Sequence, residues 1–262
     1  MQEIRYSFQN FECDIAWDSI IGTREEQQDS YYIGHDKSSL LAVVCDGMGG
    51  LTAGNEASDA AVSTIRTLYK KKTEGTCFQD FFCNAVDDMD EAVCNLSRLQ
   101  KDGRRCGTTV AAIAVQDDKL FWLSCGDSRI YIIRNDEIVQ VTRDHNYRME
   151  LDVLLKRNRI TAWEYQQKMQ NSDALISYIG MGGVDLFDRN STPFCLRDND
   201  IIILTSDGLY RNLPQNELLS MASSDESNLS IIKKMFSRAS YNANASQDNT
   251  TAILLKYRRK KI

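Results

Sequence analysis

Short apolar runs and longer amphipathic stretches divide the chain into predicted strands and helices. In the strand-like runs, β-branched, aromatic and leucine residues follow one another between turn-forming residues. In the helix-like stretches, apolar residues recur every three or four positions, as Ala57, Ala61, Ile65 and Leu68 do. The predicted strands are 30–34, 40–46, 108–116, 119–127, 128–135, 137–142, 201–208 and 250–257, and the predicted helices are 53–73, 78–101, 147–157, 161–170, 214–221 and 226–241.

The order of these elements predicts an antiparallel architecture. The strands do not alternate one for one with helices, as a doubly wound parallel sheet would require. Residues 119–142 are expected to form three successive strands joined by tight turns at Asp127-Ser128 and Asn135-Asp136, an antiparallel meander. We therefore predict an α+β fold in which helices pack outside an antiparallel β-sandwich.

The chain is predicted to form one domain over residues 1–262. It contains only two prolines, and no glycine- or serine-rich linker interrupts the pattern. Residues 147–190 are polar and mostly helical, and they separate two groups of strands. We interpret them as an insertion over one end of the sandwich, where binding specificity commonly resides.

Composition and charge restrict the partners and the location. The formal net charge of −6 gives no support for a nucleic-acid-binding surface, and the basic tail 256–262 is interpreted as a solvated chain end. No leader pattern is visible, no apolar run approaches the roughly 18 residues that span a bilayer, and the eight cysteines contain no C-x-x-C pair. We predict a cytoplasmic monomer that binds neither nucleic acid nor membrane.

Five aspartates lie at the ends of predicted strands. Asp46 and Asp207 each close a long apolar run and precede a glycine, Asp127 follows another strand, and Asp29 and Asp248 precede strands. Turn chemistry explains each one taken alone. Taken together, carboxylates that converge at one end of a sandwich repel one another unless cations lie among them.

Oxygen ligands select hard divalent ions, Mg²⁺ or Mn²⁺. Only two histidines occur, His35 and His145, so a histidine-rich zinc site is excluded. Several hard ions together can activate a water for in-line attack on phosphorus, which predicts phosphoester hydrolysis. Arg24, five residues before Asp29, is a candidate phosphate clamp, because a guanidinium can bind two phosphate oxygens at once.

Seven short motifs extend this picture over about residues 15–258. They are GTREEQQDS (22–30), VVCDGMGG (43–50), GTT (107–109), CGDSRIYIIR (125–134), VTRDHN (141–146), LTSDGLY (204–210) and SQDNTTAILL (246–255). In this order they resemble the metal-dependent serine/threonine protein phosphatase family known as PP2C or PPM, of the stand-alone bacterial type. The resemblance implies a four-layer α-β-β-α arrangement with a binuclear metal centre at one end.

The resemblance also implies roles for individual residues. Asp46 would bridge both metal ions, and the carbonyl of Gly47 would bind the second. Asp207 and Asp248 would complete the first metal site. Asp29 would hold water near the second.

Three further expectations follow from the resemblance. Asp127, with Asp207, would bind a weaker third ion, and Arg24 would bind the phosphate. A water bridging the two metals would attack phosphorus directly, without a phosphoenzyme. The residues expected to carry catalysis are therefore Arg24, Asp46 and Asp207.

Some positions depart from the family pattern. Met48 stands where animal relatives usually carry a histidine proposed as general acid, so a water would have to protonate the leaving oxygen. Gln28 replaces a common acidic residue beside the second metal, which removes one negative charge. SYIGMGG (177–183), within the expected flap 147–190, replaces an arginine-containing turn.

The prediction for function is a protein serine/threonine phosphatase that opposes a Ser/Thr kinase and uses two or three Mn²⁺ or Mg²⁺ ions. Two alternatives stay open at this point. One is a catalytically inactive PP2C-like binding module, although all five aspartates are retained. The other is a phosphatase dedicated to one regulatory phosphoprotein.

Overall fold

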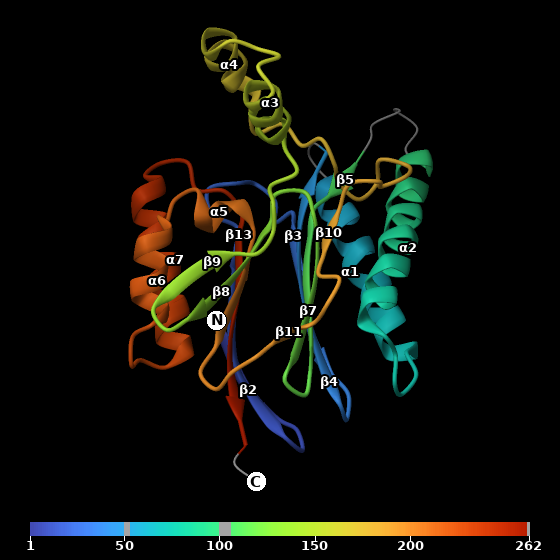
Figure 1. The fold of residues 1–262 in the computed structure, drawn as a ribbon, viewed down its shortest axis with the longest axis vertical. Helices are drawn as coiled ribbons and strands as arrows, with labels where there is room; N and C mark the ends of the chain where they lie inside the picture. Colours follow the sequence, from blue (N-terminus) through green and yellow to red (C-terminus); the bar gives the residue numbers. More distant parts are fainter. Residues whose placement is uncertain (50–52, 100–105, 261–262) are drawn as a thin grey trace.

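Two antiparallel β-sheets face each other, and helices cover the outer face of each (Figure 1). The computed structural model describes residues 1–49, 53–99 and 106–260. The first sheet has the order β1 (Gln2–Ser7), β2 (Phe11–Ile20), β13 (Thr250–Arg259), β12 (Ile201–Thr205), β8 (Arg129–Arg134) and β9 (Glu137–Gln140). The second has the order β10 (Asp188–Arg189), β7 (Lys119–Cys125), β6 (Val110–Gln116), β4 (Ser39–Met48) and β3 (Asp29–His35), with β11 (Phe194–Cys195) on β7 and β5 (Gly107–Thr108) on β4.

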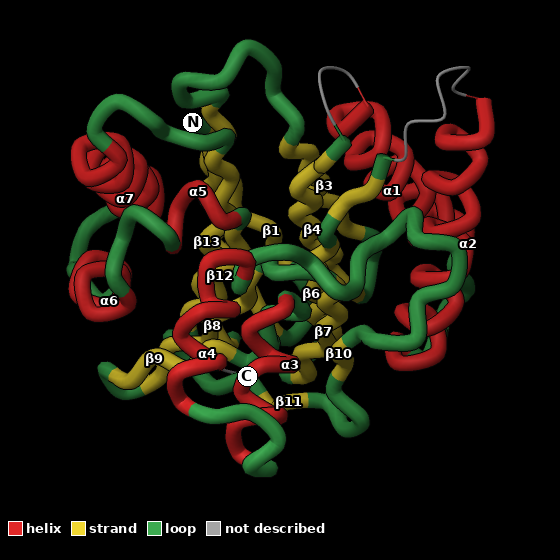
Figure 2. Tube along the Cα trace, turned by 90° about the horizontal axis from the view of Figure 1, so that it is seen from above, coloured by secondary structure: helices red, strands yellow, loops and turns green. Residues whose placement is uncertain are grey.

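The helices form an outer layer on each side of the sandwich (Figure 2). On one side, α1 (Ala53–Lys71) and α2 (Phe78–Leu99) pack against the second sheet. On the other, α5 (Asp207–Tyr210), α6 (Gln215–Ala222) and α7 (Asn228–Ala243) cover the first sheet. The predicted α+β sandwich flanked by helices is therefore confirmed; positions 100–101 of the predicted second helix and Gly50 of the second motif lie outside the described residues.

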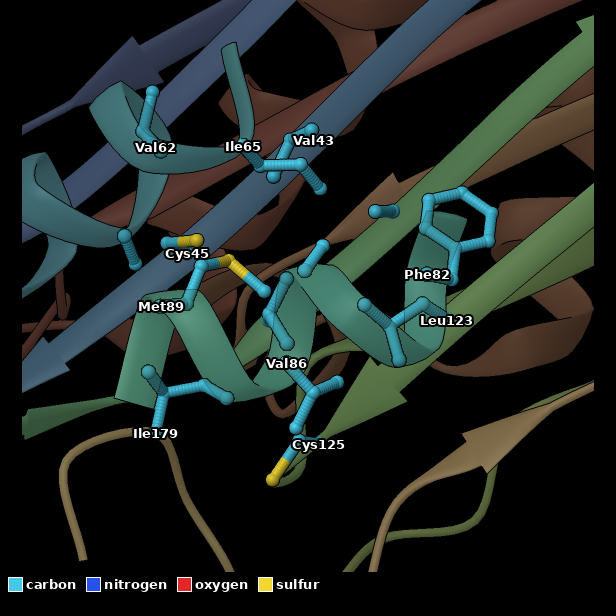
Figure 3. Packing of buried hydrophobic residues seen from close by; sticks show 14 of the residues in the cluster. Val43, Cys45, Val62, Ile65, Phe82, Val86, Met89, Leu123, Cys125 and Ile179 are labelled. Atoms are coloured by element: carbon cyan, nitrogen blue, oxygen red, sulfur yellow. The ribbon is translucent and has the colours of Figure 1, made fainter. Parts of the chain in front are cut away.

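Strand β4 shows why its sequence is almost continuously apolar. Ala42 and Val44 point into the core between the two sheets. Val43 and Cys45 point the other way, toward α1 and α2, where Met89 packs beside them (Figure 3). Because both faces of this strand are buried, every residue between Ser39 at its start and Asp46 near its end is apolar.

The predicted three-stranded meander is wrong at its first turn. The second turn is confirmed: Asn135 and Asp136 both have positive φ, 52° and 59°, and they join β8 to β9 in a hairpin. At Asp127-Ser128, however, the chain crosses from β7 in one sheet to β8 in the other. This crossing allows alternate residues of β8, such as Ile130, to pack in the core between the sheets.

The N-terminal strands β1 and β2 were absent from the predicted elements. Polar residues interrupt β2, and the buried carboxylate of Asp14 obscures its strand pattern. Asp14 is neutralised across the sheet by Arg5 of β1 and Arg258 of β13. Arg258 lies 244 positions from Asp14 in the sequence, so this partner becomes visible only once the sheet has formed.

Three helical segments lie beyond the sandwich at one end: α3 (Tyr147–Lys156), α4 (Ala162–Lys168) and the 3₁₀ helix η1 (Met169–Asn171) (Figure 1). They occupy the first part of the predicted insertion, whereas most of its second part is irregular before β10. Among the described residues, every helix is too short or too polar to cross a lipid bilayer.

Candidate active site

The five strand-end aspartates meet at the end of the sandwich that carries α5 and β5 (Figure 1). Asp29 begins β3 and lies directly opposite Asp46 in the β3–β4 register. Asp207 begins α5, Asp127 lies between β7 and β8, and Asp248 precedes β13. The charges of the other four all act on Asp46, which places it at the electrostatic centre of the group.

The GTT motif holds the backbone of Asp46. The amide of Thr109 donates to the carbonyl of Asp46 at 2.8 Å, and the hydroxyl of Thr108 donates to the same carbonyl at 2.9 Å. In return, the amide of Asp46 donates to the Thr109 hydroxyl oxygen at 3.0 Å. The hydroxyls of Thr109 and Ser128 are 2.6 Å apart, which links β6 to the start of β8.

Asp29 is buried and only half satisfied. The hydroxyl of Ser206 donates to its Oδ2 at 2.7 Å, and that hydroxyl accepts from the amide of Thr251 at 2.9 Å. Within the described part of the chain, Oδ1 of Asp29 is buried without a hydrogen-bond partner. A buried oxygen without a partner is costly, so this atom is suited to accept a cation or a ligand proton.

Burial dominates the acid-base behaviour of the cluster. It raises the pKa of Asp29 to about 7, helped by nearby carboxylate charges. It raises the pKa of Asp46 well above the ordinary value, with Asp29 and Asp207 as the next causes. It also raises the pKa of Asp207 to about 6, although the charge of Arg211 opposes the rise. All three carboxyl groups therefore hold their protons more tightly than an exposed aspartate does.

Two arginines partly neutralise the cluster. Nη2 of Arg24 lies 2.6 Å from Oδ2 of Asp248, with the Arg24 side chain 60% exposed. Nε of Arg211 lies 2.9 Å from Oδ2 of Asp207, and its Nη2 lies 3.3 Å from Oδ2 of Asp127.

Sequence reasoning singled out Arg24 but missed Arg211. The available signal was its position four residues after Asp207 at the end of a helical turn.

Asn249 is a second residue that sequence reasoning missed, although it lies within the SQDN motif. Its Oδ1 accepts from the amide of Gln28 at 2.8 Å, and its Nδ2 donates to the carbonyls of Ile21 and Glu26. The carbonyl of Gln28 in turn accepts from the amide of Gly47 at 2.9 Å. Asn249 thus fixes the loop that carries Arg24 against the start of β13.

The donor chemistry of this cluster fits hard divalent ions, although the ligands are not yet gathered around them. Within residues 1–49, 53–99 and 106–260, no three histidine, cysteine or carboxylate side chains are already arranged to hold a metal. The cluster nevertheless combines carboxylate oxygens, a buried oxygen without a partner and raised pKa values. A divalent ion would offset the carboxylate repulsion that adds to the effect of burial on these pKa values. To bind the ion, Asp248 would have to give up its ion pair with Arg24.

Comparison with known proteins identifies the family. A sequence profile of the family described as protein phosphatase 2C matches residues 18–249. The chain belongs to the protein phosphatase 2C family. The serine/threonine phosphatase stp of Listeria innocua is 26% identical to it over 223 residues, which cover 84% of this chain and 85% of that protein.

Solved structures share the PP2C fold. The serine/threonine phosphatase of S. agalactiae has a TM-score of 0.81 at 23% identity, and the match covers 93% of this chain and 98% of that one. The catalytic domain of the phosphatase PstP, solved in complex with two manganese ions, has a TM-score of 0.75 at 23% identity. That match covers 95% of this chain and 100% of the PstP chain.

In this PP2C chain, a glycine-rich turn connects the insertion to the site. Within SYIGMGG, the amides of Gly180, Gly182 and Gly183 donate to the carboxylate of Asp90, at 2.6, 3.3 and 2.7 Å. Ile179 then exchanges two backbone hydrogen bonds of 2.9 Å with Thr108, which holds Asp46. The segment that departs from the family pattern is therefore anchored by a buried acid on α2.

Gly208 allows α5 to pack directly against the chain entering β13. A Cβ at this position would lie 2.1 Å from the carbonyl oxygen of Asn249 and 2.5 Å from the Thr250 hydroxyl oxygen. We expect Gly208→Ala to lower the free energy of unfolding by about 3 kcal/mol, because backbone atoms cannot move aside as side chains do. Chemical denaturation measures this loss, and Asn216→Ala on the exposed side of α6 is the control. Unchanged stability of Gly208→Ala would contradict the close approach.

Proposed function

We propose that this PP2C-family chain is a metal-dependent phosphatase that removes phosphate from phosphoserine and phosphothreonine in proteins. The observation that carries the proposal is the convergence of five aspartates, from five separate segments, at one end of the sandwich. We also propose that residues 1–262 form one catalytic domain, with residues 147–190 as a flap beside the site.

The proposed ligands follow from their places in the cluster. Asp46, at its centre, would contact two ions, and the carbonyl of Gly47 would bind one of them. Asp207 and Asp248 would complete one site, and the buried Oδ1 of Asp29 would face the other through water. When bound, Mn²⁺ or Mg²⁺ would activate a water for in-line attack on phosphorus.

The remaining residues would position the substrate and the proton. Arg24 lies at the exposed rim of the cluster, where its guanidinium can leave Asp248 and bind two phosphate oxygens. Met48 ends β4 opposite Gly107 and cannot donate a proton. Protonation of the leaving serine or threonine oxygen would therefore fall to water.

The retained aspartates favour catalysis over an inactive binding module. Each of the five positions still carries a carboxylate, and four of them are held by hydrogen bonds or ion pairs to Ser206, Arg24 or Arg211. The specific phosphoprotein substrates, the opposing kinase, the monomeric state and the cytoplasmic location stay predictions. A panel of phosphopeptides, together with one phosphorylated regulatory protein, would separate a broad enzyme from a dedicated one.

Metal removal tests the proposal directly. We expect protein stripped with a chelator to release no phosphate from a phosphothreonine peptide, and added Mn²⁺ or Mg²⁺ to restore turnover. Release of inorganic phosphate is measured as each metal is titrated, with circular dichroism to show that the stripped protein stays folded. Metal-independent turnover, or no turnover by folded protein with either ion, would contradict the proposed function.

A further inference from the structure

Arg211 makes contacts that single it out among the arginines of the site. Its three nitrogens each face a different carboxylate: Nε lies 2.9 Å from Asp207, Nη2 3.3 Å from Asp127, and Nη1 2.8 Å from Asp173. Its amide donates to the carbonyl of Asp207 at 3.0 Å, so the backbone that carries it continues the turn of α5. Ion pairs therefore fix the guanidinium of Arg211, and a helical hydrogen bond fixes its backbone.

The family resemblance implies that the same pair, Asp127 and Asp207, would bind a third metal ion. In the structure the guanidinium of Arg211 bridges these two carboxylates. The hydroxyl of Tyr210 donates to the same oxygen of Asp127, at 3.2 Å. A divalent ion placed between the carboxylates would have to displace both donors and would be repelled by a guanidinium that cannot lose its charge.

The third contact extends this arrangement to the insertion. Asp173 belongs to residues 147–190 and follows η1, and its side chain is largely exposed. Arg211 also lines a polar pocket of about 220 Å³ together with Tyr210, Asp173 and Arg148. Solvent therefore reaches the guanidinium, and an ion from solution could enter if the side chain were shortened.

We propose that Arg211 takes the place of the third metal ion. On this inference, which rests on the proposed function, the chain binds two divalent ions and keeps a permanent cation between Asp127 and Asp207. The third ion of the expected site does not fit beside that cation. The same side chain ties Asp173, and with it the insertion, to the acidic cluster.

Counting bound metal tests this inference without measuring activity. Wild-type protein, Arg211→Ala and Arg211→Gln are dialysed against increasing Mn²⁺, and bound ions per chain are measured by atomic absorption. We expect the wild type to saturate at two ions and each Arg211 variant to gain one weaker site. The added site should disappear in the double variant Arg211→Ala/Asp127→Asn. Arg148→Ala, which removes a different arginine from the same pocket, should bind two ions.

The outcomes separate this inference from the proposed function. A third ion in the wild type that is lost in Asp127→Asn would overturn the role of Arg211 and leave the phosphatase assignment intact. Arg211 variants that fold, as judged by thermal melting, yet still bind two ions would also overturn it. No Mn²⁺ bound by folded wild-type protein would refute the proposed metal centre and this inference together.

Discussion

Asp46→Asn is expected to lower the turnover of a phosphothreonine peptide roughly a thousandfold or more, because it removes the central charge on which the proposed metal centre depends. Asparagine has the same shape, so the backbone contacts from Thr108 and Thr109 to this residue can persist. The substitution also relieves repulsion from Asp29 and Asp207, which act strongly on Asp46. The metal-free variant should therefore melt at the same temperature as the wild type or higher.

Two measurements and one control make this prediction specific. Phosphate release at saturating Mn²⁺ reports catalysis, and calorimetric titration with Mn²⁺ reports loss of metal affinity. Asp136→Asn removes the same charge at the exposed β8–β9 turn, where asparagine also tolerates a positive φ. It should keep full activity. Full activity of Asp46→Asn would show that the carboxylate cluster is not the catalytic centre.

Asp90→Ala is expected to lower the free energy of unfolding by about 3 kcal/mol, since it leaves three amide donors near a buried site without their charged acceptor. Asp90 is 6% exposed and accepts from the amides of Gly180, Gly182 and Gly183. For a chain of this size the loss corresponds to a decrease of roughly 6–12 °C in Tm. Turnover should fall too, because Ile179 of the same turn is bonded to Thr108 beside Asp46.

Differential scanning calorimetry of the metal-free protein checks the effect of Asp90→Ala on Tm. Asp90→Asn keeps one acceptor oxygen in the same place and should lie between the wild type and the alanine variant. Asp87→Ala, on the exposed side of the same helix, should change Tm very little. A Tm for Asp90→Ala equal to that of the wild type would show that the glycine turn holds its conformation without the carboxylate.

Local patterns predicted most of the fold because they record burial directly. The apolar run of β4 and the periodic alanines of α1 each report which faces are covered, and both elements form close to their predicted bounds. The same patterns failed where the stabilising partner is remote. Strand β2 carries the buried acid Asp14, whose charge is offset by Arg5 of the adjoining strand and by Arg258, 244 positions away. No local signal records the contribution of Arg258.

In the candidate site, too, the local sequence predicted some features and missed others. The strand-end positions of Asp29, Asp46, Asp127, Asp207 and Asp248 were visible in the sequence because each follows or precedes an apolar run. Their neighbours were not visible. Arg211 contacts Asp127, which lies 84 positions earlier in the chain, and the amide of Gly180 donates to Asp90, which lies 90 positions earlier. Both contacts exist only because separate layers pack together.

The sequence by itself determined the sandwich class, the helical layers and the acidic residues at the strand ends, since these depend on burial within one element. Only the tertiary structure decided that β7 and β8 belong to different sheets. It alone placed the guanidinium of Arg211 between Asp127 and Asp207. The physical reason is that the strength of an ion pair depends on the distance between the two charged groups in space. That distance is set by how the two sheets and their helices pack.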